Sequence, residues 1–225
     1  MRLLERLRKV IRIQKMKMPQ GGLEDFDMRM IFATGNSDKM REIREIMADM
    51  DVEILSMKEA GISVEIDEDG TTFEENALIK AKAVAACTDV IVLADDSGLE
   101  VDYLNKEPGV YSARYMGEDT SYEIKNQAIL DRLAGVPKEQ RTARFVCAIA
   151  AVLPDKNTLV TRKTIEGYIG DRPAGANGFG YDPIFYVPEY GCTTAELSVE
   201  EKNRISHRAR ALAAMKEQLE IKLAE

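Results

Sequence analysis

The hydrophobic positions of this chain alternate between short apolar runs and runs with helical spacing, which is typical of α/β proteins. Consecutive apolar residues predict buried strands at 30–33, 52–55, 90–93 and 143–153, with a hairpin partner for the last at 158–168. Apolar residues three and four apart predict helices at 39–50, 72–88, 120–134 and from Ser206 to about Ile221. The pattern predicts an α/β fold, either one domain or one domain folded as two lobes.

Two adjacent carboxylates follow the apolar run at 90–93 and are the first candidates for chemistry. Asp95 and Asp96 come directly after this run and precede Ser97 and Gly98. We expect the strand to end here, so that both acids lie at its carboxyl end, where open α/β sheets place their ligands. Two acids in that position indicate a metal site or a general base. The alternative is a turn capped by one of the acids, because Asp-Ser-Gly sequences are common in loops.

The turn after the first strand is a candidate phosphate site. Thr34-Gly35-Asn36-Ser37 leads into the helix that is predicted from Lys39. A strand, a small polar loop and a helix N-terminus together bind anions, because backbone N–H groups and the helix dipole face the loop. Thr34, Asn36 and Lys39 are placed to contact phosphate. The loop lacks the glycines and the GK[ST] ending of a P-loop, and Ser37 could instead cap the helix.

Three further segments carry polar or aromatic candidates. Four acids within 65–69 precede a helix that opens with a capping box, and Glu68 becomes a metal-ligand candidate only if the fold brings it to Asp95 and Asp96. Glycines flank Phe179, and a ring held in this way can stack on a planar base or pack into the core. Tyr181 and Asp182 follow at once. A second capping box leads to Lys202, His207 and Arg208, of which His207 is the only histidine in the chain.

Composition excludes several classes of protein. The 225 residues are 45% hydrophobic and 31% charged, which fits a soluble globular protein with a sizeable core. No apolar run is long enough for stable membrane insertion. The net charge of −8 argues against nucleic acid as a partner but not against a small anion in a locally basic pocket. Three cysteines without metal-ligand spacing indicate ordinary thiols of a reducing compartment, so we expect a cytoplasmic protein.

The N-terminal region differs in charge from the rest of the chain. Residues 1–18 contain seven basic residues and one acid, and Leu4, Leu7 and Ile11 share one helical face. This predicts a basic amphipathic helix that could touch a membrane surface, a partner or the acidic body of the protein. Gly21 and Gly22 lie in a linker. We therefore divide the chain into an extension with its linker, residues 1–27, and a catalytic domain, residues 28–225.

Five stretches, taken in order, identify a family. They are FATGNSDKMREI at 32–43, EDGTTFEENALIKA at 68–81, ADDSGLEVD at 94–102, GANGFGYDPIF at 175–185 and AELSVEEKNRISHRARAL at 195–212. With them the chain resembles the inosine triphosphate pyrophosphatase family, Ham1/RdgB-like hydrolases that remove non-standard purine nucleotides, over roughly residues 28–223. The resemblance implies two lobes on a long, twisted mixed sheet flanked by helices, with the active cleft between the lobes. It also implies a homodimer that uses Mg²⁺ to cleave purine nucleoside triphosphates, such as ITP, dITP and XTP, to a monophosphate and pyrophosphate.

The resemblance also assigns roles to individual residues. Thr34, Asn36 and Lys39 match its triphosphate-binding positions, and Glu68 and Asp96 match its metal ligands. Asp96 also matches the proposed general base, with Asp95 and Ser97 in support. Phe179 matches the ring that stacks on the base, with Tyr181 and Asp182 beside it, and Tyr181 stands where some members have Trp. Lys202, His207 and Arg208 match substrate-binding positions.

Two other functions fit parts of the same pattern. A Maf-like pyrophosphatase would act on other nucleotides, but the NGFGYDP and SHR stretches argue against it. A non-catalytic nucleotide sensor would keep the pocket without turnover. The presence of Lys39, Glu68, Asp95 and Asp96 argues against a sensor, because binding alone does not require this set of charged groups.

Overall fold

The fold is built on a long mixed sheet. The computed structural model describes residues 29–48, 50 and 52–222. Within them the sheet has the strand order β2-β1-β3-β4-β5-β6-β7. Strands β2, β1 and β3 are parallel to one another, and the remaining pairs are antiparallel. The strands are β1 (Arg29–Phe32), β2 (Glu53–Ser56), β3 (Ile91–Val101), β4 (Thr142–Val152), β5 (Thr158–Ile169), β6 (Phe185–Val187) and β7 (Cys192–Thr193).

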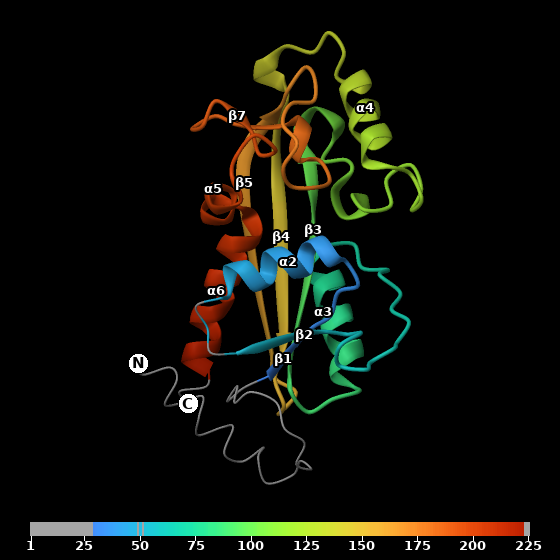
Figure 1. Ribbon diagram of the computed structural model, residues 1–225. Coiled ribbons are helices and arrows are strands. Elements are labelled where there is room, and N and C mark those ends of the chain that lie inside the picture. The colour runs from blue at the N-terminus through green and yellow to red at the C-terminus, as the bar shows by residue number, and fades with distance from the viewer. Residues whose placement is uncertain (1–28, 49, 51, 223–225) are drawn as a thin grey trace.

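Helices cover both faces of this sheet and define two lobes. The helices are α2 (Ser37–Ile46), α3 (Phe73–Ala85), α4 (Tyr122–Arg132), α5 (Val199–Ile205) and α6 (His207–Lys222). Figure 1 shows β3, β4 and β5 running the length of the molecule, with β1, β2 and α3 in one lobe and α4 and β7 in the other. The predicted α/β fold with two lobes on a long mixed sheet is confirmed.

Three apolar cores hold the lobes together. Side chains of α2 and α6 pack on one face of the first lobe's sheet, and those of α3 pack on the other. A third core, which includes Leu99, Ile129 and Phe185, fills the second lobe. Each fully buried Leu, Ile or Phe stabilises the fold by about 1.5–3 kcal/mol relative to an exposed side chain. The long strands cross from the first pair of cores into the third, which fixes the lobes relative to each other.

Local signals in the sequence set the helix starts. Thr72 and Glu75 form the expected capping box at α3, and Ser198 and Glu201 form the one at α5. At α2 the cap is Asn36, whose side chain accepts hydrogen bonds from Asp38 N and Lys39 N. The alternative that Ser37 caps this helix was wrong, because Ser37 is already its first residue.

The prediction that the central strand ends before Asp95 was also wrong. β3 continues to Val101, and Asp95 and Asp96 pair with Ile149 and Ala148 of β4. The strand can continue because β4 supplies backbone partners along its whole length and because cations neutralise both carboxylates. Only the parallel neighbour β1 stops, at Phe32. The acids therefore lie where the parallel part of the sheet ends and the edge of β3 opens.

Two of the sequence predictions concern the N-terminal extension and membrane insertion. The extension at residues 1–27 lies outside the described residues. Among the helices that are described, none combines the length and the apolar character needed to cross a bilayer.

Candidate active site

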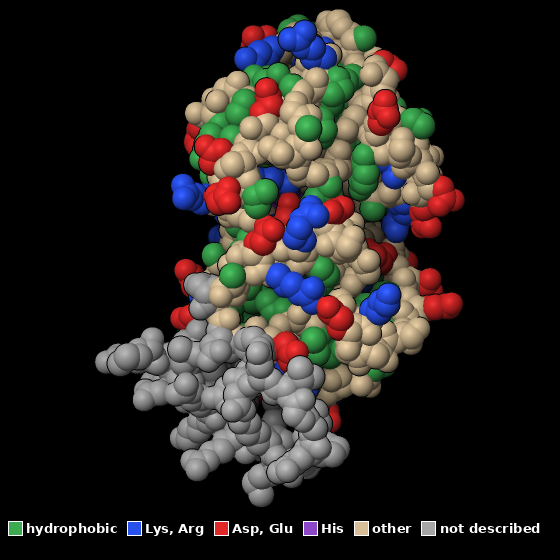
Figure 2. Space-filling view, in the orientation of Figure 1, with side chains coloured by type: hydrophobic (Ala, Val, Ile, Leu, Met, Phe, Trp, Pro, Cys, Tyr) green, Lys and Arg blue, Asp and Glu red, His purple; other side chains and the backbone are tan. Residues whose placement is uncertain are grey.

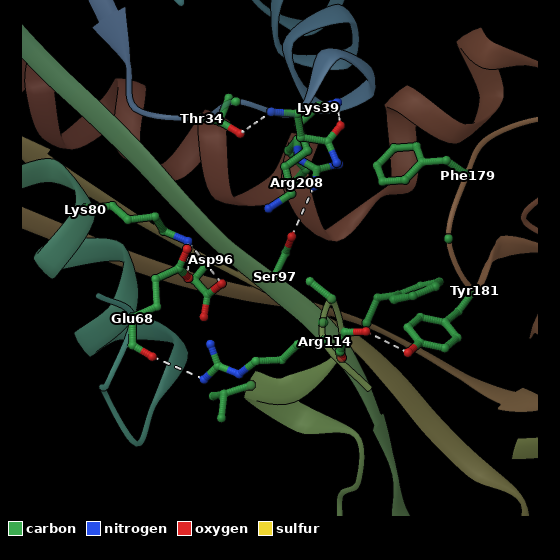
Figure 3. Close-up of a pocket in the computed structure, with 18 of the residues that line it drawn as sticks. Thr34, Lys39, Glu68, Lys80, Asp96, Ser97, Arg114, Phe179, Tyr181 and Arg208 are labelled. Atoms are coloured by element: carbon green, nitrogen blue, oxygen red, sulfur yellow. Dashed lines mark hydrogen bonds and ion pairs between the residues drawn. The ribbon is translucent and has the colours of Figure 1, made fainter. Parts of the chain in front are cut away.

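A cavity of about 570 Å³ lies between the two lobes. In Figure 3 the cations and carboxylates gather at one end, around Lys39, Lys80 and Asp96, and aromatic rings lie at the other. Figure 2 shows acidic and basic side chains grouped in a band across the middle of the molecule, between the lobes. All predicted site residues except Asp95 line this cavity: Thr34, Asn36, Lys39, Glu68, Asp96, Ser97, Phe179, Tyr181, Asp182, Lys202, His207 and Arg208.

The two central acids point to opposite faces of the sheet, because side chains alternate along a strand. Asp95 faces α2 and α6, where its Oδ2 lies 3.1 Å from Lys39 Nζ and 3.3 Å from an Arg208 nitrogen. Ser97 Oγ donates to the same oxygen at 3.2 Å. Burial alone would raise the pKa of Asp95, but Lys39 and Arg208 outweigh it and lower the pKa well below its usual range. Asp95 is therefore a permanent anion that holds two cations beside the cavity.

Asp96 faces α3 and borders the cavity. Its Oδ1 lies 3.3 Å from Lys80 Nζ, and its Oδ2 accepts a hydrogen bond from Asn76 Nδ2 at 3.3 Å. Burial, helped by the charges of Glu68 and Asp95, raises the pKa of Asp96 against the opposing effect of Lys80 and Lys39. Of the two neighbouring acids, Asp96 is thus the one with the higher proton affinity and with access to a substrate.

Glu68 lies close to Asp96, whereas Asp95 points to the other face of the sheet. Lys80 Nζ contacts Glu68 Oε2 at 2.7 Å and also contacts Asp96, so one ammonium bridges the two carboxylates. Arg114, from the second lobe, donates to the backbone oxygen of Glu68 at 3.1 Å. The described residues contain no group of three or more His, Cys, Asp or Glu side chains that could hold a metal. A cation here would rely on these two carboxylates and on oxygens from its substrate.

Some polar groups of the loop after β1 form hydrogen bonds within the loop and with the start of α2. Asp38 N and Lys39 N donate to Asn36 Oδ1 at 2.9 and 3.0 Å, and Asn36 N donates to Thr34 Oγ1 at 3.2 Å. Asn36 therefore shapes the start of α2, with two of the helix N–H groups already bound to its side chain. The Lys39 ammonium, held by Asp95, lines the cavity beside this loop.

Phe179 is held in the cavity by the residues that follow it. Asp182 Oδ2 accepts from Phe179 N at 2.8 Å and from Lys202 Nζ at 2.6 Å, and Asp182 Oδ1 accepts from Thr194 Oγ1 at 2.8 Å. Gly178 has a φ of +73°, and a Cβ there would lie 2.1 Å from Asp182 Oδ2, so the loop requires glycine. The Asp182 carboxylate is fully engaged and positions the aromatic loop.

Tyr181 has a similar structural part. Its hydroxyl donates to the backbone oxygen of Ser112 at 2.7 Å, and its ring packs edge-on against Tyr122. Its burial raises its pKa, so the hydroxyl keeps its proton. Tyr181 thus contributes a ring to the cavity wall, while its hydroxyl joins this loop to the segment that contains Ser112.

A buried network of charged side chains joins the last of the five quoted stretches, residues 195–212, to α2. Glu42 contacts Lys202 Nζ at 2.7 Å through one oxygen and Arg208 through the other. Lys202 and Arg208 also lie over the Phe179 ring, 5.0 and 5.7 Å from its centre. These contacts place two cations beside the aromatic end of the cavity.

Two polar atoms in this motif have no partner within the described residues. They are His207 Nδ1 and Arg208 Nε, both buried. The His207 ring stacks on Phe145 at 5.0 Å, and burial together with the nearby cations keeps its pKa well below the usual range, so the ring is neutral. Buried polar groups are nearly always hydrogen-bonded to protein, ordered water or a ligand, so both atoms are open to a further partner.

Four residues with clear parts in the site were missed in the sequence. Glu42, Asn76 and Lys80 all lie within the five quoted stretches, but on predicted helices whose most visible pattern is the apolar face. Asn76 and Lys80 are four residues apart, which places both on one face of α3. That spacing was a readable signal. Arg114 lies outside the quoted stretches, and only the fold brings it to Glu68.

Sequence comparison with known proteins identifies the family of this chain. The sequence model for the Ham1 family matches residues 30–218. The chain belongs to the Ham1 family. This Ham1-family chain is 48% identical over 190 residues to the dITP/XTP pyrophosphatase of Bacillus subtilis (strain 168), an alignment that covers 84% of this chain and 96% of that protein. It is 52% identical over 189 residues to the dITP/XTP pyrophosphatase of Thermoanaerobacter sp. (strain X514), covering 84% and 95%.

Solved structures of the Ham1 family share the fold. The Ham1 protein of Staphylococcus aureus superposes with a TM-score of 0.77 at 42% identity, covering 86% of this chain and 99% of that one. A nucleoside-triphosphatase (dITP/XTP pyrophosphatase) from Mycobacterium abscessus superposes with a TM-score of 0.68 at 42% identity, covering 84% and 98%. The match spans almost the whole of each relative, so the two-lobed domain is the unit that they have in common.

Proposed function

We propose that this chain hydrolyses non-standard purine nucleoside triphosphates, namely ITP, dITP and XTP, to the monophosphate and pyrophosphate. The observation that carries the proposal is one cavity that has cations and paired carboxylates at one end and the Phe179 ring at the other. The relatives named dITP/XTP pyrophosphatase support it. Removal of such nucleotides from the cellular pool is the purpose that this activity serves.

The phosphate end binds a polyanion through charge and hydrogen bonds. Lys39, Lys80 and Arg114 line one side of the cavity, together with Thr34 and Asn36. An ammonium or guanidinium is a strong partner for a phosphate oxygen, because both groups are ionised. The same cations would stabilise the charge that develops on the departing pyrophosphate.

Glu68 and Asp96 are the residues that would hold Mg²⁺. Mg²⁺ is commonly held by one or two protein carboxylates and completes its shell with waters and phosphate oxygens, so this donor pair fits. When bound, the ion neutralises phosphate charge and polarises the bond to be broken. The pair lies at the same end of the cavity as Lys39 and Arg114, which is where the triphosphate is expected.

Asp96 is the proposed general base. In the metal-free fold its pKa is raised above the usual value and, unlike Asp95, it borders the cavity, so it can take a proton from a water beside the substrate. The proton passes from water to Asp96 as the water oxygen bonds to the α-phosphorus, and the bond from that phosphorus to the bridging oxygen breaks. Asp95 supports this step indirectly, because it anchors Lys39 and Arg208 on the other face of β3.

Arg208 is the proposed reader of the base, and Phe179 is the surface on which the base stacks. Hypoxanthine and xanthine carry a carbonyl at C6 that can accept a hydrogen bond from a guanidinium, whereas adenine carries an amino group there. A site that leaves its buried donor unpaired with the wrong substrate can discriminate by roughly 10⁴-fold. Arg208 lines the cavity and lies 5.7 Å from the centre of the Phe179 ring, which supports a donor role beside a stacked base.

The test is a nucleotide panel with Mg²⁺ in which pyrophosphate and orthophosphate are measured separately. ITP, dITP and XTP should yield the monophosphate and pyrophosphate, with ATP and GTP much slower. IDP and orthophosphate as the main products would contradict the proposal. We also propose that the protein is cytoplasmic and that it forms a homodimer. The molar mass measured by light scattering tests the homodimer.

A further inference from the structure

The Lys80 ammonium lies between the two carboxylates to which we assign the metal. Its Nζ is 2.7 Å from Glu68 Oε2 and 3.3 Å from Asp96 Oδ1. The side chain is 11% exposed and points from α3 at both acids (Figure 3). A divalent cation bound to both acids would lie among the same oxygens. The Lys80 ammonium, which is covalently part of the chain, and an exchangeable divalent cation would therefore compete for the same pair of acids.

The carboxylates are also held by a contact that does not involve Lys80. Asn76, fully buried and one turn earlier on α3, donates to Asp96 Oδ2 at 3.3 Å and accepts from Gly70 N at 2.9 Å. Gly70 lies two residues after Glu68, and a Cβ on it would lie only 2.6 Å from Asn76 Oδ1. Asp96 and the Glu68 loop are thus fixed to the same helix, so removal of the ammonium need not scatter them.

We propose that Lys80 is a built-in competitor for the divalent cation: its ammonium neutralises Glu68 and Asp96 until a nucleotide arrives, and then transfers to the phosphates. The proposal rests on the proposed function, because it needs a polyphosphate as the second partner of Lys80. Lys80 lines the same cavity as Lys39 and Arg114, so a triphosphate bound there offers oxygens within reach of the flexible lysine stem.

The consequence is coupling between metal and nucleotide. Without nucleotide, a metal ion must displace an ammonium that is already paired with both acids. With nucleotide, the ammonium gains phosphate contacts, and the two acids become free for the metal. Because coupling between two ligands is reciprocal, metal should promote nucleotide binding by the same factor.

The proposed competition involves movement of the Lys80 side chain and no change in its protonation. Burial lowers its pKa, but Asp96, Asp95 and Glu68 together outweigh this effect and raise its pKa above the usual value. Near neutral pH the competitor leaves the acids only by movement of the side chain.

The experiment measures Mn²⁺ binding to the full chain by the electron paramagnetic resonance signal of free Mn²⁺, with and without α,β-methylene ITP, which cannot be cleaved between these phosphates. Wild type should bind Mn²⁺ weakly alone and much more tightly with the analogue. Lys80→Met should bind Mn²⁺ alone at least ~10-fold more tightly than wild type, because a nearby unit charge opposes the dication. Its gain on adding the analogue should shrink by a similar factor.

Three variants make the result specific. Lys82→Met removes the same charge from an exposed position on the same helix and should leave Mn²⁺ binding unchanged. Lys80→Arg keeps the charge and should keep nucleotide-free binding weak. Lys80→Gln provides a second neutral side chain, and far-UV circular dichroism checks that each variant is folded.

The proposal is wrong if Lys80→Met and Lys80→Gln bind Mn²⁺ in the absence of nucleotide no more tightly than wild type does. It is also wrong if Lys82→Met tightens Mn²⁺ binding as much as Lys80→Met does. If no variant bound the analogue at all, the proposed function would fail. The nucleotide-free titration would still decide whether Lys80 opposes the metal, so the two failures can be distinguished.

Discussion

Replacing Arg208 with alanine should destabilise the protein as well as change its base selectivity. Arg208 is 2% exposed and contacts Glu42 and Asp95, both themselves buried. Removing one partner of a buried ion pair typically costs 3–5 kcal/mol, because a charge is left without compensation. Here each carboxylate keeps a second cation, Lys202 for Glu42 and Lys39 for Asp95. We therefore expect a loss at the lower end, about 3 kcal/mol.

Urea unfolding at pH 7 measures this loss. The chain has no tryptophan, so far-UV circular dichroism is the suitable signal. For a domain of this size, about 3 kcal/mol corresponds to a decrease of roughly 6–12 °C in melting temperature. Arg208→Lys should recover much of the stability, because it keeps a charge near both acids. Glu42→Gln combined with Arg208→Ala should lose less than the two single losses added together.

The same variants separate base reading from folding. Arg208→Lys lacks the planar guanidinium, so it should lose much of the ratio of kcat/KM for ITP over ATP while remaining stable. Folded Arg208→Ala should lose both ITP activity and this preference, whereas Phe179→Ala should weaken all purines about equally, because stacking does not read the base edge. A stability loss below about 1 kcal/mol for Arg208→Ala would refute the buried network. An unchanged ITP/ATP ratio would refute the reading role of Arg208.

Three further predictions use other parts of the molecule. Asp96→Asn should lose at least ~100-fold in turnover yet still bind nucleotide, as steady-state kinetics and analogue binding will show, and near-normal activity would move the base to another carboxylate. The pKa of His207 is well below its usual value in the fold, whereas an unfolded histidine has a pKa of about 6.5. Below that pH the unfolded state therefore binds more protons, and stability decreases as the pH is lowered. His207→Phe should flatten this decline between about pH 6.5 and 5, by up to ~1.4 kcal/mol per pH unit in urea unfolding, and an unchanged slope would contradict a buried neutral ring. A chain that starts at Met28 should keep nearly full ITP hydrolysis, because every matched stretch lies downstream; a large loss would show that the extension completes the site.

The sequence by itself determined the order and type of the main elements. Apolar runs and helical spacing placed β1, β2, β4, β5, α3, α4 and α6 close to their observed bounds, since burial of one face imposes a period that can be read without a partner. The predicted helix at 39–50 was too long at its end, because α2 stops at Ile46, and no ranges were predicted for α5, β6 and β7. The capping boxes at Thr72 and Ser198 were equally legible, because a cap is satisfied within four residues of chain. The candidate site residues were predicted from short polar motifs and from the family resemblance.

Only the tertiary structure decided what those residues do for one another. Asp95 and Asp96 are neighbours in sequence, yet the pleat of β3 sends them to opposite faces, one to α2 and α6 and the other to α3. Local sequence could not show that β3 continues through them, because the strand is sustained by β4 and by cations that are distant in the chain. The pairing of Glu68 with Lys80, of Arg114 with the Glu68 backbone, and of Glu42 with Arg208 likewise depends on contacts between separate elements. Such contacts set the charge and proton affinity of each group, and for that reason the chemistry of the site is a property of the fold.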